Sequence, residues 1–256
     1  MKKVGVLFSG GLDSTYLIWK NLMDGNQVTP IYIEIKNNTN KTILEKNRID
    51  LLYNKFYENF GNNITDIKYI MDIYIDAFVN NLYFTQMPIW ITGLIFSQGL
   101  CVDELQIGYI ANDDIISYID DIQKLYYSYK PFVNNIKPLR FPLLKSCKND
   151  IFEELPLEYK KLIVSCEDPI ILNENSMIID YKPCGNCSSC KRIINSNYYM
   201  TGNFPDNYKE VVVMYHMDAL QRIDIDIVKK MILQFESKNE SIDNTNVSIK
   251  NSEIIN

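Results

Sequence analysis

Residues 4–19 read VGVLFSGGLDSTYLIW, an apolar run that breaks into glycines and then resumes at helical spacing. This pattern predicts a buried strand, a tight turn and the N-terminus of a helix. Gly10 and Gly11 can adopt backbone angles closed to residues with a Cβ, so several backbone N–H groups can converge on phosphate oxygens. Asp13 and Ser14 stand where N-capping residues belong. The turn is therefore either an anion-binding site or an ordinary capped turn between a strand and a helix.

The complete string SGGLDS favours the anion site, because it resembles the PP-loop of ATP pyrophosphatases, which cleave ATP between its α and β phosphates. The pattern GxxxxGK[ST] of a P-loop that transfers the γ-phosphate is absent from the sequence. The resemblance implies ATP and Mg²⁺ as cofactors and ATP binding by Phe8, Ser9, Gly10, Gly11, Leu12, Asp13, Ser14 and Thr15. Asp13 and Ser14 are expected to be catalytic, with Asp13 as an orienting or metal-linked group.

Four cysteines have the spacing of a metal site. Cys184, Cys187 and Cys190 form a CxxCxxC motif, and Cys166 lies upstream of it. Four thiolates are the ligand set of a closed structural zinc site, so we expect Zn²⁺ here. An iron–sulfur cluster is an alternative. Disulfides are not expected, because no apolar signal segment opens the chain and a reducing cytoplasm is therefore indicated.

Composition limits the class of protein. Hydrophobic residues make up 46% of the 256 residues, which is ample for the core of one large α/β domain or of one domain with a small appendage. The net charge of −6 and the pI near 5.0 argue against a broad basic face for nucleic acid. No apolar run approaches the roughly 18 residues of a membrane span, so no membrane partner is expected. The single histidine, His216, excludes mechanisms that need several imidazoles.

Strand and helix patterns alternate along the chain. Strands are predicted at 4–8, 28–35, 64–70 and 104–108, helices at 41–60, 90–100 and 146–155, and an extended segment at 137–142. This alternation predicts an α/β fold with a doubly wound, mainly parallel sheet, whose ligands bind at the carboxyl ends of the strands. The SGGLDS turn and Gly108 both fall at such ends, so Gly108 joins the expected ATP site.

The region beyond the cysteines is predicted to add helices at 191–199 and 225–235 and a strand at 211–215. Residues 237–256 are dominated by Asn, Ser, Glu and Asp, a composition typical of a disordered tail. We therefore expect a PP-loop nucleotide-binding domain over 1–160, a small zinc-binding region over 161–236 and this tail.

Motifs at both ends resemble one family. SGGLDST at 9–15 and Cys166 with Cys184-x-x-Cys187-x-x-Cys190-Lys191-Arg192 are similar to the 7-cyano-7-deazaguanine synthase family, QueC. So are Leu105-Gln106-Ile107-Gly108, Asp114-x-x-x-Tyr118-x-Asp120, Pro138-Leu139 and Lys148-Asn149-Asp150-Ile151. The resemblance implies an adenine nucleotide alpha hydrolase-like fold and a homodimeric cytosolic enzyme of queuosine biosynthesis. Such an enzyme adenylates the carboxylate of 7-carboxy-7-deazaguanine, releases pyrophosphate, and uses ammonia to form the amide and then the nitrile.

Further residues take roles from this resemblance. Lys148 is a candidate catalytic residue that neutralises charge at the α-phosphate. In the substrate site, Tyr118 could stack on the deazapurine ring and Asp120 could accept from its exocyclic amine. Gln86 is assigned to the same site.

The middle of the chain departs from the family. The family's P-G-R-N segment is replaced by Thr85-Gln86-Met87-Pro88-Ile89-Trp90, and Ser117, Ile119, Asp121 and Ile122 replace expected residues around Tyr118 and Asp120. An alternative is therefore a QueC-like enzyme of an antiphage defence cluster, which conjugates the deazapurine to a protein amine. A PP-loop tRNA thiolase and a non-catalytic nucleotide-binding protein are further alternatives. Thiolation would call for a reactive cysteine pair and a basic RNA face.

Overall fold

The computed structural model describes residues 1–74, 86–110, 113, 115–146, 148–175 and 177–190. His216, Asp114, the elements predicted beyond Cys190 and the predicted tail lie outside these residues. Within the described ranges, no helix combines the length and the apolarity that a bilayer span requires.

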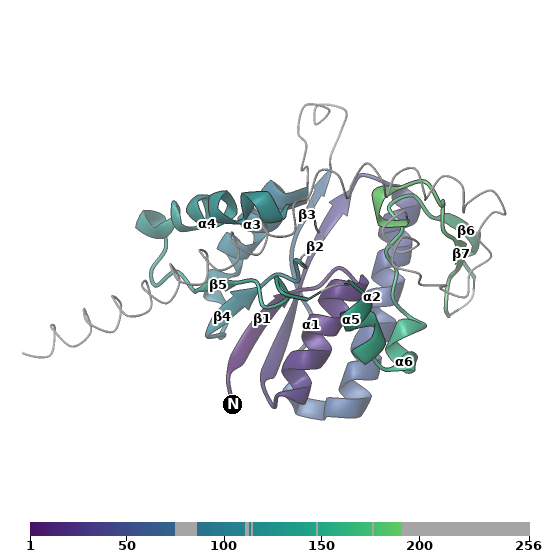
Figure 1. Cartoon of the computed structure of the whole chain (residues 1–256), viewed down its shortest axis with the longest axis horizontal. Coiled ribbons are helices and arrows are strands. Elements are labelled where there is room, and N and C mark those ends of the chain that lie inside the picture. The colour runs from purple at the N-terminus through teal and green to yellow at the C-terminus, as the bar shows by residue number, and fades with distance from the viewer. Residues whose placement is uncertain (75–85, 111–112, 114, 147, 176, 191–256) are drawn as a thin grey trace, which may run out of the picture.

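Five parallel strands form the central sheet in the order β3-β2-β1-β4-β5 (Figure 1). They are β1 (Lys3–Leu7), β2 (Gln27–Lys36), β3 (Lys68–Tyr74), β4 (Glu104–Gln106) and β5 (Leu139–Arg140). The chain winds from β1 outward to β3, then returns to the other side of β1 for β4 and β5. This confirms the expected α/β fold with a doubly wound parallel sheet, and the strand order reverses between β1 and β4.

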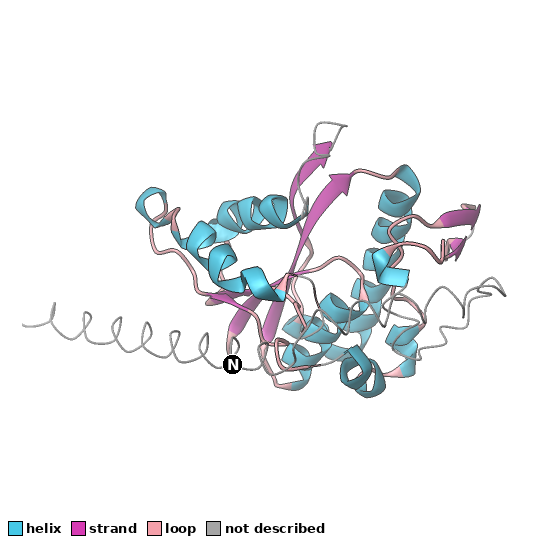
Figure 2. Ribbon diagram, turned by 45° about the horizontal axis from the view of Figure 1, so that its top comes forward, coloured by secondary structure: helices cyan, strands magenta, loops and turns pink. Residues whose placement is uncertain are grey.

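Helices cover both faces of the sheet (Figure 2). One core cluster joins the sheet to α1 (Leu12–Met23), α2 (Thr39–Phe60), α5 (Lys148–Glu154) and α6 (Leu157–Lys160). The other joins it to α3 (Gln86–Phe96) and α4 (Ile119–Tyr127). Side chains along β1 alternate between the two faces of the sheet, so this strand contributes to both cores. Val4 and Val6 belong to the first core and Leu7 to the second. Central strands are therefore buried on both faces, as parallel sheets require.

A small antiparallel hairpin, β6 (Ile170–Asn173) with β7 (Asp180–Lys182), follows the main sheet. It is fastened to α2, because Nη2 of Arg48 donates to the Ile179 carbonyl at 2.8 Å and the Ile179 amide donates to Oδ1 of Asn47 at 3.2 Å. The sequence analysis did not predict this hairpin or α6. Short 3₁₀ turns, at Gly61–Asn63, Ser97–Gly99, Ile116–Tyr118 and Lys130–Phe132, complete the described elements.

Several predicted boundaries differ from the structure; the helix expected at 90–100, for example, spans Gln86–Phe96. The strand expected at 64–70 begins at Lys68, because Ile64 forms only an isolated bridge with Val28 and buries its side chain in the core. The strand expected at 104–108 ends at Gln106. The Ile107 amide still donates to the Arg140 carbonyl of β5 at 3.1 Å, and Ile107 and Gly108 line a cavity.

Candidate active site

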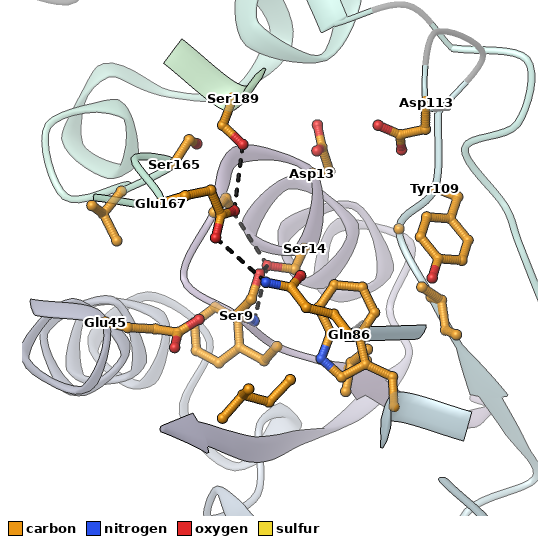
Figure 3. Close-up of a pocket in the computed structure, with 18 of the residues that line it drawn as sticks. Ser9, Asp13, Ser14, Glu45, Gln86, Tyr109, Asp113, Ser165, Glu167 and Ser189 are labelled. Atoms are coloured by element: carbon orange, nitrogen blue, oxygen red, sulfur yellow. Dashed lines mark hydrogen bonds between the residues drawn. The ribbon is translucent and has the colours of Figure 1, made fainter. Parts of the chain in front are cut away.

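A cavity of about 380 Å³ opens beside the carboxyl ends of β1, β2 and β4 (Figure 3). This volume is typical of sites for small molecules. Its walls come from the start of α1, the first turns of α2 and α3, the segment after β4, the N-terminus of α5 and segments 164–167 and 188–189. It lies at the point where the strand order reverses, which is where doubly wound sheets bind ligands.

The SGGLDS turn forms the floor of this cavity. Gly10 has a φ of 70°, and a Cβ built on it would lie 3.3 Å from Cγ1 of Ile49, so both its backbone angle and its surroundings require glycine. The Ser9 amide donates to Oγ of Ser14 at 3.2 Å, and the two hydroxyls lie 3.2 Å apart. These contacts hold Ser9 and Ser14 together at the cavity surface.

The N-cap of α1 is Gly11, and no side chain caps the helix there. The expectation that Asp13 or Ser14 caps the helix is therefore wrong, because both lie within its first turn. Because Gly11 has no side chain, it offers no acceptor to the first backbone N–H groups of α1, and these groups lie at the positive end of the helix dipole. The turn is therefore open to an anion.

Most of the predicted ATP-binding residues face the cavity. Phe8, Ser9, Gly11, Asp13, Ser14 and Gly108 line it. Gly10, Leu12 and Thr15 are buried and do not line it. Gly108 has little room for a side chain, because a Cβ at this position would lie 3.1 Å from the backbone carbonyl of Asp13. The end of β4 thus packs directly against the first turn of α1.

Asp13 and Lys148 meet in the cavity although 134 residues separate them in the sequence. Nζ of Lys148, at the start of α5, lies 3.2 Å from Oδ2 of Asp13. The Lys148 side chain is only 8% exposed and that of Asp13 24%. Oδ1 of Asp13 is buried and has no partner among the described residues. A buried carboxylate oxygen with spare capacity fits a cation such as the Mg²⁺ that accompanies ATP.

A polar wall on one side of the floor joins β2, α2 and segment 164–167. The hydroxyl of Tyr32 donates to Oε2 of Glu45 at 3.1 Å, and Lys41 forms an ion pair with Glu167. Nε2 of Gln86 lies 3.4 Å from Oε2 of Glu167. Gln86, assigned to the substrate site from the sequence, therefore lines the cavity.

The two acids of this wall, Glu45 and Glu167, differ in their electrostatic surroundings. Burial raises the pKa of Glu45 to about 7, although the charge of Lys41 and the hydrogen bond from Tyr32 oppose the shift. Glu167 is held by Lys41, by Gln86 and by Oγ of Ser189 at 3.5 Å. The sequence analysis did not assign Tyr32, Lys41, Glu45 or Glu167 to the site. The pattern that could have indicated Lys41 and Glu45 is the run of polar residues that follows the apolar strand predicted at 28–35.

An aromatic wall faces this polar one. Figure 3 shows Tyr109 and Asp113 on the opposite side from Glu45 and Glu167, with the SGGLDS turn between the two sides. The rings of Trp90 and Tyr109 have centroids 6.3 Å apart, and Oδ2 of Asp113 accepts from the Ile110 amide at 3.0 Å. This wall combines flat apolar surface with one carboxylate.

Two predicted substrate residues do not reach the cavity. Tyr118 belongs to a 3₁₀ turn and is 47% exposed, and Asp120 lies in the first turn of α4. Neither contributes to the lining, whereas Tyr109 and Asp113 do. The chain has left the cavity by the time α4 begins, so Tyr109 and Asp113, from the segment before α4, line it instead of Tyr118 and Asp120.

The four predicted cysteine ligands form one cluster. The sulfur atoms of Cys166, Cys184, Cys187 and Cys190 all lie within 4.8 Å of one another. Hydrogen bonds from the neighbouring thiols of Cys166 and Cys190 lower the pKa of Cys187. Backbone amides also point at the sulfurs, as from Cys187 to Cys184 at 3.3 Å and from Cys190 to Cys187 at 3.3 Å. Four converging thiols with amide donors around them could hold a metal ion.

Comparison with known proteins leaves the family open. No family model matches the chain, and no curated protein matches it in sequence. The chain is similar to the crystal structure of a predicted subunit of tRNA methyltransferase from Methanocaldococcus jannaschii, at 17% identity and a TM-score of 0.39. The match covers 81% of this chain and 92% of that chain. A likeness at this level carries no conclusion about family or activity, so the functional argument rests on the residues of the cavity.

Proposed function

We propose that this chain is an ATP pyrophosphatase that transfers the adenylyl group of ATP to a carboxylate and releases pyrophosphate. The observation that carries the proposal is the SGGLDS turn itself. It sits at the reversal point of a doubly wound sheet, with Gly10 in the left-handed region and the uncapped start of α1 at the cavity. Backbone donors of this kind suit phosphate oxygens.

The chemistry explains why adenylation would be needed. A carboxylate is a poor acyl donor because its leaving group would be oxide, whereas an acyl-adenylate loses AMP. Ser9, Ser14 and the amides at the start of α1 would hold the pyrophosphate leaving group. Lys148 would neutralise charge at the α-phosphate, and Asp13 would orient it. Mg²⁺ bound through Asp13 would further neutralise the triphosphate.

We propose 7-carboxy-7-deazaguanine as the carboxylate, on the QueC resemblance. The aromatic wall supports this choice, because Trp90 and Tyr109 offer ring faces and Asp113 can accept from an exocyclic amine. Asp113 and Tyr109 thus take the roles that the sequence analysis assigned to Asp120 and Tyr118. The product would be an amide or nitrile, and the acceptor either ammonia or, in a defence system, a protein amine.

The cysteine cluster would bind zinc as a structural metal. All four ligand positions would be filled by thiolates, which leaves no open position for catalysis. Cys166 adjoins Ser165 and Glu167, which line the cavity. Zinc would therefore act on the active site by holding this segment in place.

Product analysis tests the proposal. The purified protein is incubated with MgCl₂, ATP labelled at the α-phosphate and 7-carboxy-7-deazaguanine, with a control that lacks the carboxylate. We expect AMP and pyrophosphate that depend on the carboxylate. Release of ADP and orthophosphate would contradict the proposal.

A further inference from the structure

We propose that the polar wall formed by Tyr32, Lys41, Glu45 and Glu167 binds the amine that accepts the activated acyl group, with Glu45 as its proton acceptor. This inference rests on the proposed adenylation and names the second substrate of the same cavity. The chemical class is a primary amine in its cationic form, either ammonium or a lysine side chain.

Charge on this wall favours a cation. It carries two carboxylates and one lysine, and Lys41 is committed to Glu167 by their ion pair. Burial lowers the pKa of Lys41, but the charges of Glu167 and Glu45 more than offset this and raise it, so Lys41 stays cationic. With Glu45 ionised, the wall holds one negative charge that Lys41 does not compensate, and an ammonium group would compensate it.

Hydrogen bonding leaves Glu45 available and Glu167 occupied. Oε2 of Glu167 accepts from Lys41 and lies 3.4 Å from Nε2 of Gln86, while Ser189 reaches Oε1. Among the described residues, Glu45 receives one hydrogen bond, from the Tyr32 hydroxyl at 3.1 Å. Of the two carboxylates of this wall, Glu45 is therefore the one with spare hydrogen-bonding capacity toward the cavity.

Position places Glu45 beside the expected reaction centre. A Cβ built on Gly10 would lie 3.8 Å from the backbone oxygen of Glu45, so the helix that carries Glu45 packs directly on the SGGLDS turn. Figure 3 shows Glu45 on the opposite side of the SGGLDS turn from Asp113. A deazapurine on the aromatic wall and an amine on the polar wall would thus approach the same phosphate-binding floor from opposite sides.

The proposed step balances in atoms and charge. Glu45 takes one proton from the ammonium group, and the freed nitrogen lone pair attacks the acyl carbon. The C–N bond forms as the C–O bond to AMP breaks, and AMP leaves with that electron pair. The amide nitrogen loses its second proton to solvent. Burial poises Glu45 for this exchange by bringing its pKa near neutrality, in the presence of Tyr32, Lys41, Glu167 and Glu34.

Glu45→Gln separates amine deprotonation from adenylation. Carboxylate-dependent exchange between ATP and pyrophosphate measures adenylation and should be unchanged. Transfer to ammonium or to Nα-acetyllysine amide should fall roughly 10²-fold or more, the usual contribution of a general base. Transfer to hydroxylamine, which is uncharged at neutral pH and needs no such base, should be retained. The amine that the wild-type protein uses identifies the acceptor as ammonia or a lysine.

Controls keep the outcomes distinct. Glu58→Gln changes an exposed acid on the same helix and should leave every rate unchanged. In Tyr32→Phe, loss of a hydrogen bond that lowers the pKa of Glu45 should shift the pH midpoint of transfer upward, which a purely structural role would not do. Equal transfer to ammonium by Glu45→Gln and wild type would overturn the inference alone. A raised KM for ATP in Glu45→Gln would assign Glu45 to adenosine and also overturn it. Absence of exchange in the wild type would overturn the adenylation proposal itself.

Discussion

The backbone amide of Val164 donates to the carbonyl oxygen of Gly10 at 3.0 Å. This single bond connects the glycine turn to the segment that leads into Cys166. A second bond, from the Glu167 amide to the sulfur of Cys187 at 3.4 Å, continues the connection to the cysteine cluster. The cysteine cluster and the SGGLDS turn are therefore mechanically linked, although they lie far apart in the sequence.

Metal removal should weaken ATP binding as well as the fold. We expect about one zinc per chain, and chelation or Cys187→Ser should lower the melting temperature, because binding a structural zinc contributes ~10 kcal/mol or more to folding. Loss of order at Val164 should also raise the Kd for ATP. Metal analysis, thermal unfolding and ATP titration check this. Iron with sulfide in place of zinc would contradict the assignment.

Lys148→Ala should abolish most adenylation while the protein stays folded. The lysine is the cation beside Asp13 at the cavity, and loss of a preorganised charge that stabilises the transition state typically costs 10²-fold or more. Steady-state release of pyrophosphate measures the effect. Lys161→Ala, an exposed lysine after α6, is the matched control. Equal rates for both variants would show that Lys148 has no role in the reaction.

Gly108→Ala should reduce affinity for ATP, because its Cβ would press on the Asp13 carbonyl and displace the start of α1. Gly99→Ala is the matched control, since a Cβ there meets nothing within 4 Å. ATP titration of both variants checks the difference. Unchanged affinity in Gly108→Ala would mean that the first turn of α1 can shift without loss.

Asp113→Asn should weaken binding of 7-carboxy-7-deazaguanine by ~1.5–3 kcal/mol, the value of a hydrogen bond to a charged group. Asp120→Asn should have little effect, because Asp120 does not line the cavity. Calorimetric titration compares the two. A larger loss of affinity in Asp120→Asn than in Asp113→Asn would instead support Asp120, the residue assigned to the substrate from the sequence.

Glu45→Gln should stabilise the protein at pH 8 but not at pH 4. In the folded state the pKa of Glu45 is raised from 4.5 to about 7, so the folded protein holds this proton more tightly than the unfolded chain. The contribution of Glu45 to the free energy of unfolding therefore decreases as the pH rises from about 4.5 to about 7. Above this range the full cost of burying its charge opposes folding. A gain of roughly 3 kcal/mol is expected at pH 8 from denaturant unfolding. Glu58→Gln should show no such pH dependence.

Local sequence determined most strands and helices of the main sheet and the two motifs, but it did not indicate the β6–β7 hairpin or α6. Apolar runs ending in Gly10 and Gly108 predicted β1, β4 and the glycine turn, because a turn's backbone angles depend on adjacent residues. The cysteine spacing predicted that the four thiols cluster, because closely spaced residues in tight turns are brought together locally. Helical and strand periodicity sufficed for the doubly wound sheet.

Only the tertiary structure decided which distant side chains share the cavity. The contacts between Asp13 and Lys148 and between Tyr32 and Glu45 depend on where α1, α2 and α5 dock on the sheet. The choice of Asp113 over Asp120 depends on where α4 begins, since a shift of a few residues along a helix rotates a side chain to another face. Side-chain direction and docking are set by packing between segments far apart in the chain, and no local pattern specifies them.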